Sequence, residues 1–408
     1  MRVRCRHCDI DLEVPADAEG RTIRCPSCRE TFVCEIPQAV VVDPESPPAG
    51  NEGELLLSEE LPPADDALEL TEEAPPEAAA PPDDRPASEI LADLDITETR
   101  HPQDGHISLE VGQREFDVRV ASLPTFLGER VVLRLLDQTS VLSGIKDLGL
   151  ESDDEETLSN LIEQPYGMIL VTGPTGSGKT TTLYAALNQK NVMTESIVTL
   201  EDPVEYQLSG INQVQVDPEI GRTFASVLRA SLRQDIDVLL VGEIRDSETA
   251  HIAIRAAMTG HLVFSTLHTN DAPEAINTLR NMGVPAYLIS SALTGVVAQR
   301  LVRTICKECR THYKPSESVV KSVGLPASVK RLYRGKGCDL CYNTGNRGRT
   351  GIFEVLEITP QLRRLITEEA TLPEISKTAK YKTMADPCRA KVKSGTVTVE
   401  EYLRVIRA

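Results

Sequence analysis

The chain contains no apolar run that approaches the roughly 18–20 residues needed to cross a bilayer. Its first residues, MRVRC, lack the apolar core of an export signal, so we expect a cytoplasmic protein. Basic residues are in the minority, with 43 Lys and Arg against 62 Asp and Glu. This balance disfavours nucleic-acid binding that is driven by bulk positive charge.

The acidic excess is concentrated in residues 35–87. This segment carries 15 Asp and Glu, one Arg, 11 of the chain's 26 prolines and no aromatic residue. Such a composition cannot bury enough apolar surface to offset the entropy lost on ordering. We therefore predict a disordered, extended linker, whose net charge of −14 leaves about −5 of the chain's −19 for all other residues.

Eight of the ten cysteines form Cys-x-x-Cys pairs, which in a chain without an export signal favours zinc over disulfides. Residues 1–34 have the spacing of a zinc ribbon with short strands at 12–14 and 21–23, and the predicted ligands are Cys5, Cys8, Cys25 and Cys28. So small a unit could not fold by apolar burial alone, so this zinc would be structural. The residues leave open whether the ribbon binds nucleic acid, protein or nothing.

A second set of cysteines predicts another zinc site in an insert at about 301–352. Its ligands would be Cys306, Cys309, Cys338 and Cys341. The residues after this insert are predicted to form a helical C-terminal region.

The most specific motif lies in residues 167–183, which read GMILVTGPTGSGKTTTL. An apolar strand at 168–172 runs into a full match to G-x-x-x-x-G-K-[ST], and a helix is predicted at 181–188. The glycines allow backbone N–H groups to turn inward around phosphate oxygens, Lys179 should reach the β- and γ-phosphates, and the Thr180 hydroxyl should bind Mg²⁺. The predicted residues that bind a nucleoside triphosphate are Gly173, Pro174, Thr175, Gly176, Ser177, Gly178, Lys179, Thr180 and Thr181.

Apolar strands and helices alternate after this loop, which predicts an α/β fold with a parallel sheet covered on both faces. The predicted strands are 196–200, 238–241 and 262–265, and the predicted helices are 223–232, 247–259 and 271–282. Before the loop, a short helix at 90–96 and strands at 106–111, 115–120 and 130–136 predict a partial α+β domain over 88–140. Residues 141–408 would then form the P-loop domain.

Acidic residues follow two of the predicted strands. Glu243 ends an apolar run, as expected of a Walker B carboxylate that holds Mg²⁺ through water or polarises the attacking water. Glu201 and Glu205 follow the strand at 196–200, where a ligand crevice or a solvated turn would explain them equally well. Next to the strand at 262–265, His268 and its polar neighbours could sense a γ-phosphate.

These segments resemble the secretion ATPase superfamily, most closely its type II secretion and type IV pilus assembly branch (the GspE/PilB family). The resemblance covers about 88–408, and its motifs occur in the family's order at 202–206, 210–216, 228–235, 241–246 and 259–271. Four segments resemble the family's nucleotide-site elements. They are Walker A at 173–180, the Asp box at 201–205, Walker B ending at Glu243, and the His box at 261–268.

The resemblance implies a RecA-like core and a hexameric motor that hydrolyses ATP to drive pilin or pseudopilin assembly. It implies an inner-membrane platform protein as partner and a location peripheral to that membrane. Its catalytic residues would be Lys179, Glu201, Glu205, Glu243, His268 and two arginines that face the nucleotide on closure, Arg119 and Arg134. The cysteine insert favours an assembly or secretion motor over a retraction motor.

The sequence departs from the family at its front end. The family's first domain and the first half of its second have no counterpart, and the ribbon and acidic linker stand in their place. Two other functions therefore stay open: a nucleotide-responsive scaffold or regulator that does not hydrolyse ATP, and an ATPase linked to DNA uptake or conjugation whose ribbon touches DNA.

Overall fold

The computed structural model describes residues 91–112, 114–137, 144–190 and 192–406, and the backbone of four short strands closer to the N-terminus. Strand β1 (Arg2–Arg4) pairs antiparallel with β2 (Asp11–Glu13), and β3 (Thr22–Arg24) pairs with β4 (Thr31–Val33). The strands expected at 12–14 and 21–23 overlap β2 and β3. The four cysteines predicted to bind zinc in this part, and the linker at 35–87, lie outside the described residues. The chain divides into units at 1–78 and 79–408, which we treat separately.

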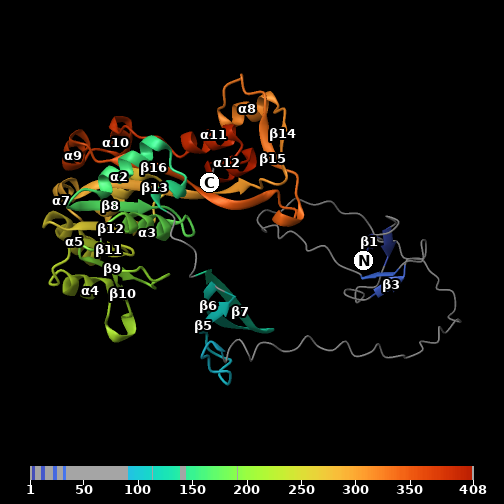
Figure 1. The fold of residues 1–408 in the computed structure, drawn as a ribbon, viewed down its shortest axis with the longest axis horizontal. Helices are drawn as coiled ribbons and strands as arrows, with labels where there is room; N and C mark the ends of the chain where they lie inside the picture. The colour runs from blue at the N-terminus through green and yellow to red at the C-terminus, as the bar shows by residue number, and fades with distance from the viewer. Residues whose placement is uncertain are drawn as a thin grey trace, which may run out of the picture. The chain divides into compact units, whose positions relative to one another are not determined.

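The second unit begins with a three-stranded antiparallel sheet in the order β5-β6-β7 (Figure 1). Its strands are β5 (Gln103–Val111), β6 (Arg114–Thr125) and β7 (Gly128–Asp137), which confirms the three strands predicted here. The helix predicted at 90–96 does not extend past Leu91, because the chain turns at Ala92 and Asp93, and its start lies outside the described residues. The buried apolar cluster at this sheet is small: Ile107, Val118 and Val120 of its strands, with Ala92 from the segment before β5.

The larger sheet has seven strands in the order β10-β9-β11-β12-β8-β13-β16. They are β8 (Gly167–Thr172), β9 (Ile197–Glu201), β10 (Asn212–Gln215), β11 (Val238–Val241), β12 (Leu262–Leu267), β13 (Leu293–Ile305) and β16 (Asn346–Glu357). All neighbours run parallel except β13 and β16, which form an antiparallel pair. The sheet is therefore mixed, and the prediction of a parallel sheet is wrong for this edge.

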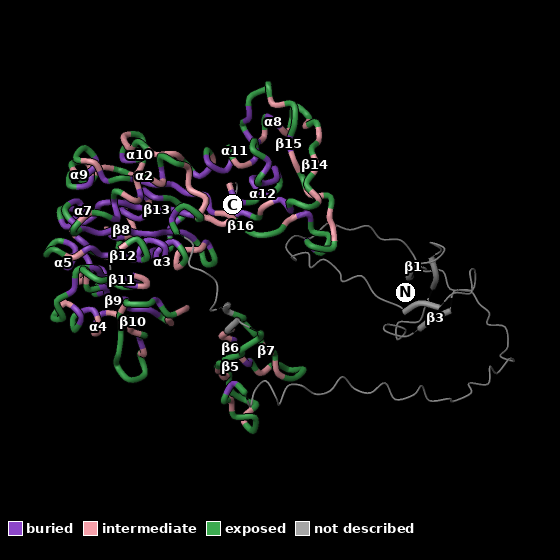
Figure 2. Tube along the Cα trace, viewed as in Figure 1, coloured by how far each residue is buried: buried purple, intermediate pink, exposed green. Residues whose placement is uncertain are grey.

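Both faces of the larger sheet are covered, as the continuous apolar strands predict. Successive residues of β8 enter opposite apolar clusters, with Met168 and Leu170 on one side and Ile169 and Val171 on the other. The first face packs against α4 (Phe224–Ser231), α5 (Ser247–Met258), α6 (Ala272–Asn281) and α7 (Ala286–Ala292). The second packs against η1 (Ile145–Leu148), α2 (Ser152–Ile162) and α3 (Lys179–Gln189). Figure 2 shows the resulting layer of buried strands.

The antiparallel pair β13–β16 frames the cysteine insert. Between the two strands lie β14 (Arg310–Tyr313), α8 (Glu317–Val323), β15 (Leu332–Gly335) and η3 (Asp339–Cys341). The predicted helical C-terminal region is confirmed by α9 (Pro360–Thr367), α10 (Leu372–Thr378), α11 (Ala385–Ser394) and α12 (Val399–Ile406). Within the described part of the chain, none of the helices has the length and apolar character needed to span a membrane.

Candidate functional site

A tight glycine-rich loop joins the end of β8 to the start of α3. Gly173, Gly176 and Gly178 have φ values of 144°, 73° and 89°, in the region that residues with a Cβ rarely adopt. A Cβ on Gly173 would lie only 2.4 Å from the carbonyl oxygen of Gln299. The loop therefore needs glycine for its backbone to reach the N-terminal end of α3, where free N–H groups and the helix dipole favour an anion.

Two side chains of this loop fit a phosphate ligand. Nζ of Lys179 donates to the carbonyl oxygens of Gly173 at 2.8 Å and Pro174 at 3.3 Å. Burial lowers the pKa of Lys179, and the nearby carboxylate of Glu243 opposes this shift. The hydroxyl of Ser177 is buried and has no hydrogen-bond partner among the described residues. A phosphate group in front of the loop would supply the charge and the acceptors that these groups lack.

One cavity of about 810 Å³ brings most of the predicted site residues together. The predicted residues that line it are Thr175, Gly176, Ser177, Gly178, Lys179, Thr180, Thr181, Glu201, Glu205, Glu243, His268 and Arg134. Gly173 and Pro174 do not line it, but their carbonyl oxygens accept hydrogen bonds from Lys179, which does. Arg119 does not line it either.

Glu243 follows β11, separated from it by Gly242, and lies at the cavity wall. Its carboxylate forms an ion pair with Arg245, and its Oε2 lies 3.6 Å from Nε2 of His268. Arg245 also lies 4.0 Å from Asp202, which follows β9. The carboxylate is thus held at the ends of the parallel strands, where open α/β sheets bind ligands.

Glu201 is buried at the end of β9, and both of its oxygens accept hydrogen bonds. Tyr184 donates to Oε2, while Thr199 and Gln213 donate to Oε1 at 2.5 and 3.1 Å. Burial and the bond to Glu201 raise the pKa of Tyr184. These partners lie on α3, β9 and β10, so the carboxylate ties the end of β9 to α3 and β10.

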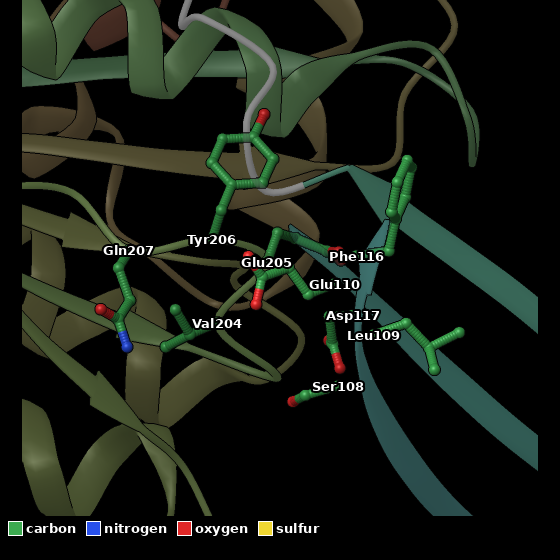
Figure 3. Close-up of a pocket in the computed structure, with 9 residues that line it drawn as sticks. All are labelled: Ser108, Leu109, Glu110, Phe116, Asp117, Val204, Glu205, Tyr206 and Gln207. Atoms are coloured by element: carbon green, nitrogen blue, oxygen red, sulfur yellow. The ribbon is translucent and has the colours of Figure 1, made fainter. Parts of the chain in front are cut away.

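Arg119 of the small sheet contacts that same segment. Its guanidinium donates to the carbonyl oxygen of Val204 at 3.0 Å and lies 3.5 Å from the carboxylate of Glu205. A second cavity, of about 610 Å³, lies between residues 204–207 and strands β5 and β6 (Figure 3). Three carboxylates line it, those of Glu110, Asp117 and Glu205, and none of the described Lys or Arg side chains does. The first cavity also has carboxylates, but Lys179, Arg134, Arg245 and Arg349 line it beside them and can bind a nucleotide's phosphates. The cavity at the glycine-rich loop is therefore the better nucleotide site.

The four cysteines of the insert lie together, as their spacing predicts. All four sulfur atoms are within 4.8 Å of one another, and three Sγ–Sγ distances are 3.8, 3.8 and 3.7 Å. Four thiolates at about 2.3 Å from a tetrahedral zinc ion would be about 3.8 Å apart, so the cluster fits zinc. Backbone N–H groups of Cys338 and Gly345 also donate to the sulfur of Cys341 at 3.3 Å, which favours its thiolate.

The cavity contains residues that the sequence analysis did not identify. Arg245, Arg349 of β16 and Phe224 of α4 line it, and Gln299 of β13 lies behind the loop. Gln299 carried a usable signal, because it and Arg300 are the two polar residues that interrupt the apolar run 296–302. Arg349 carried none, because only the pairing of β13 with β16 brings it to the cavity.

The chain is similar to known proteins over more than three quarters of its length. Residues 85–404 match the family model described as Type II/IV secretion system protein. The chain is 50% identical over 321 residues to type II secretion system protein E of Pseudomonas aeruginosa, covering 78% of this chain and 64% of that protein. It is 48% identical over 324 residues to type II secretion system ATPase E of Vibrio cholerae, with coverage of 78% and 64%. It is 47% identical over 325 residues to type IV pilus assembly ATPase PilB of P. aeruginosa, with coverage of 78% and 57%.

The chain therefore spans less than two thirds of the length of these relatives. Among solved structures, it resembles the pilus retraction motor PilT with bound ADP, with 28% identity, a TM-score of 0.55, and coverage of 79% of this chain and 80% of that one. It also resembles the ATPase DotB of Legionella pneumophila, with 20% identity, a TM-score of 0.56, and coverage of 75% and 78%. The second likeness bears on the fold alone.

Proposed function

The chain belongs to the type II/IV secretion system protein family, and on that premise we propose that it is an ATP-hydrolysing motor of type II secretion or type IV pilus assembly. The observation that carries the proposal is the single cavity that joins the glycine-rich loop, Glu243 and Arg134. Relatives named type II secretion system ATPase E and type IV pilus assembly ATPase PilB support it. The motor would couple hydrolysis to the assembly of pilin or pseudopilin subunits.

The loop and α3 bind the triphosphate. Backbone N–H groups of residues 175–181 donate to the phosphate oxygens, and Lys179 turns from the carbonyls of Gly173 and Pro174 to the β- and γ-phosphates. The Thr180 hydroxyl and Glu243 would hold Mg²⁺, which when bound neutralises charge on the β- and γ-phosphate oxygens. Glu243 also accepts a hydrogen bond from the attacking water and orients it toward the γ-phosphorus.

The remaining predicted residues act around this centre. Arg134 neutralises the charge that builds on the γ-phosphoryl oxygens, and His268 reports the state of Glu243, which it contacts at 3.6 Å. Glu201 ties the end of β9 to α3 and β10, while Glu205 and Arg119 tie the segment after β9 to the small sheet. In this assignment the core is a RecA-like P-loop domain.

Zinc has a structural part in this proposal. Cys306, Cys309, Cys338 and Cys341 would hold one ion that closes the tip of the β13–β16 pair. A second ion would be held by Cys5, Cys8, Cys25 and Cys28, on their spacing alone. What the N-terminal ribbon binds stays open.

Family membership is the only support for the assembly proposed next. We propose a homo-hexamer in the cytoplasm, peripheral to the inner membrane, that acts on an inner-membrane platform protein. There is no firm reason to add nucleic acid to these partners.

ATP turnover by the purified full chain tests the proposal. Lys179→Ala should lower kcat/KM for ATP by about 100-fold or more, because the lysine's contact with the transferred phosphoryl group is lost. Lys146→Ala, an exposed lysine before α2, is the matched control and should keep wild-type turnover. Equal turnover by wild type and Lys179→Ala would sink the ATPase assignment. Nucleotide binding without turnover in the assembled protein would favour the scaffold.

A further inference from the structure

Gln299 is a buried polar residue on the strand next to the glycine-rich loop. β13 lies next to β8 (Figure 1) and pairs with it in parallel. Ala298 lies opposite Thr172, the last residue of β8. The next residue, Gln299, therefore lies just beyond the point where β8 ends and the loop begins. Its exposed fraction is 2%, so its carboxamide is enclosed by protein rather than by solvent.

The carboxamide of Gln299 contacts the loop backbone directly. Its Nε2 donates to the carbonyl oxygen of Ser177 at 2.8 Å. Two of the loop glycines are pressed against the same residue, since a Cβ on Gly173 would lie 2.4 Å from its carbonyl oxygen and a Cβ on Gly178 would lie 3.3 Å from its Nε2. Gln299 thus forms the surface on which the loop rests.

This contact sets the direction of the next N–H group. The carbonyl of Ser177 and the N–H of Gly178 belong to one planar trans peptide, so they point in opposite directions. Holding the carbonyl on Gln299 directs the Gly178 N–H away from β13. Gly178 lines the cavity, so its N–H is placed for a phosphate oxygen.

Stability alone does not explain a glutamine at this position. Its Oε1 is buried without a hydrogen-bond partner among the described residues, which costs free energy that an apolar side chain would avoid. The amide is better explained by the hydrogen bond that its Nε2 donates to the Ser177 carbonyl oxygen of the loop.

We propose that Gln299 is a positioning residue for nucleotide binding, whose carboxamide presets the Ser177–Gly178 peptide for the phosphates. The inference rests on the proposed function and adds a residue to its binding site. The loop cradles the phosphates that ADP and ATP share. The contribution of Gln299 is therefore the same for both nucleotides, and it affects binding rather than the chemical step.

The test compares three variants of the full chain by titration with the fluorescent nucleotides MANT-ADP and MANT-ATP. Gln299→Met keeps the side-chain volume but removes the donor, so both dissociation constants should rise about 3- to 10-fold. KM for ATP should rise by the same factor with kcat within about twofold. The unfolding midpoint without nucleotide should fall no further than that of the control variant described next, since each loses one buried hydrogen bond. Gln299→Glu sets an acceptor against the Ser177 carbonyl and a negative charge near the phosphates, so it should weaken both nucleotides further.

Thr294→Val is the matched control on the same strand. Thr294 is buried, and its hydroxyl donates to the carbonyl oxygen of Met168 at 3.0 Å, at the other end of β8. Losing that bond should lower the unfolding midpoint and leave the affinity for MANT-ADP unchanged. If Thr294→Val weakens the nucleotide as much as Gln299→Met does, the effect is general loosening of β13 and the proposal is wrong.

Two further outcomes separate this inference from the proposed function. If Lys179→Ala abolishes MANT-nucleotide binding but Gln299→Met binds within twofold of wild type, the role of Gln299 is overturned and the nucleotide site stands. If Lys179→Ala binds as wild type does, the nucleotide site itself is wrong and the inference fails with it. Should Gln299→Met unfold, Gln299→Glu decides, because wild-type affinity in that variant also overturns the role.

Discussion

The seven-stranded sheet and the three-stranded sheet differ in how they bury their apolar side chains. In the larger sheet both faces are covered, and consecutive β8 residues such as Ile169 and Leu170 enter separate buried clusters. In the small sheet, side chains on one and the same face are buried on β6 but exposed on β7. Val118 is 4% exposed, whereas Leu135, opposite it on β7, is 65% exposed. Directly paired residues share a face, so the small sheet buries only part of its apolar side.

This difference separates two kinds of site residue. The glycine-rich loop and Glu243 follow strands of a fully covered sheet, so the core holds them in place. Arg119 and Arg134 come from the small sheet, whose own apolar cluster is small. Elements with few buried contacts open and shift at lower free energy than the core. We therefore expect the larger sheet to determine nucleotide affinity. The small sheet should supply positive charge, whose effect on the reaction depends on where that sheet lies relative to the nucleotide.

Truncating one leucine in each sheet should give the largest difference in stability. Leu170→Ala removes a side chain with no exposed surface and should lower the free energy of unfolding by about 3 kcal/mol, through lost burial and a residual cavity. Leu135→Ala should change it by no more than about 0.5 kcal/mol. Urea denaturation of both variants measures the contrast, and equal losses would mean that the β7 face is covered in solution.

The core elements could be predicted because their signals are local. The glycine-rich loop, its flanking strand and α3 follow from one motif, and the predicted helices at 223–232, 247–259 and 271–282 are confirmed as α4, α5 and α6. The caps explain their starts, since Thr223, Asp246 and Asp271 each accept a backbone hydrogen bond. The family indicated by the ordered motifs is also confirmed.

What could not be predicted depends on contacts between distant segments. The residues of β16 do not encode its direction, which is set by the insert that returns the chain beside β13. Arg349 reaches the cavity only through this pairing. Gln299 reaches the loop only because β13 extends beyond the last residue of β8. The ribbon ligands, the roles of the site residues and the domain boundaries at 34, 87 and 140 stay predictions.

Removing one arginine of the small sheet should affect rate and not affinity. Arg134→Gln should lower kcat for ATP by about 100-fold, because it removes a charge that stabilises the transferring phosphoryl group. MANT-ADP affinity should stay near that of wild type, since binding depends on the core loop.

Arg130→Gln is the matched control for this variant. Arg130 lies on the same strand, four residues from Arg134 and therefore on the same face, but it does not line the nucleotide cavity. It should keep wild-type kcat. A similar loss in both variants would mean that the small sheet acts through its net charge and not through a placed residue.

The smallest effect concerns a carboxylate buried in the core unit. Burial opposes ionisation of Glu401, but hydrogen bonds from Arg404 and Arg303 outweigh it and lower its pKa to about 2. Because the folded pKa lies below the unfolded value, this stabilisation is complete above about pH 5 and is lost as pH falls toward 2. Between pH 5 and pH 3 the loss should be about 2 kcal/mol of unfolding free energy.

Glu401→Gln should therefore be less stable than wild type at pH 7 and approach it at pH 3. Glu400→Gln, which changes an exposed neighbour on α12, should follow the wild-type curve throughout. A constant gap between wild type and Glu401→Gln from pH 7 to pH 3 would contradict the depressed pKa and assign the contribution of Glu401 to packing.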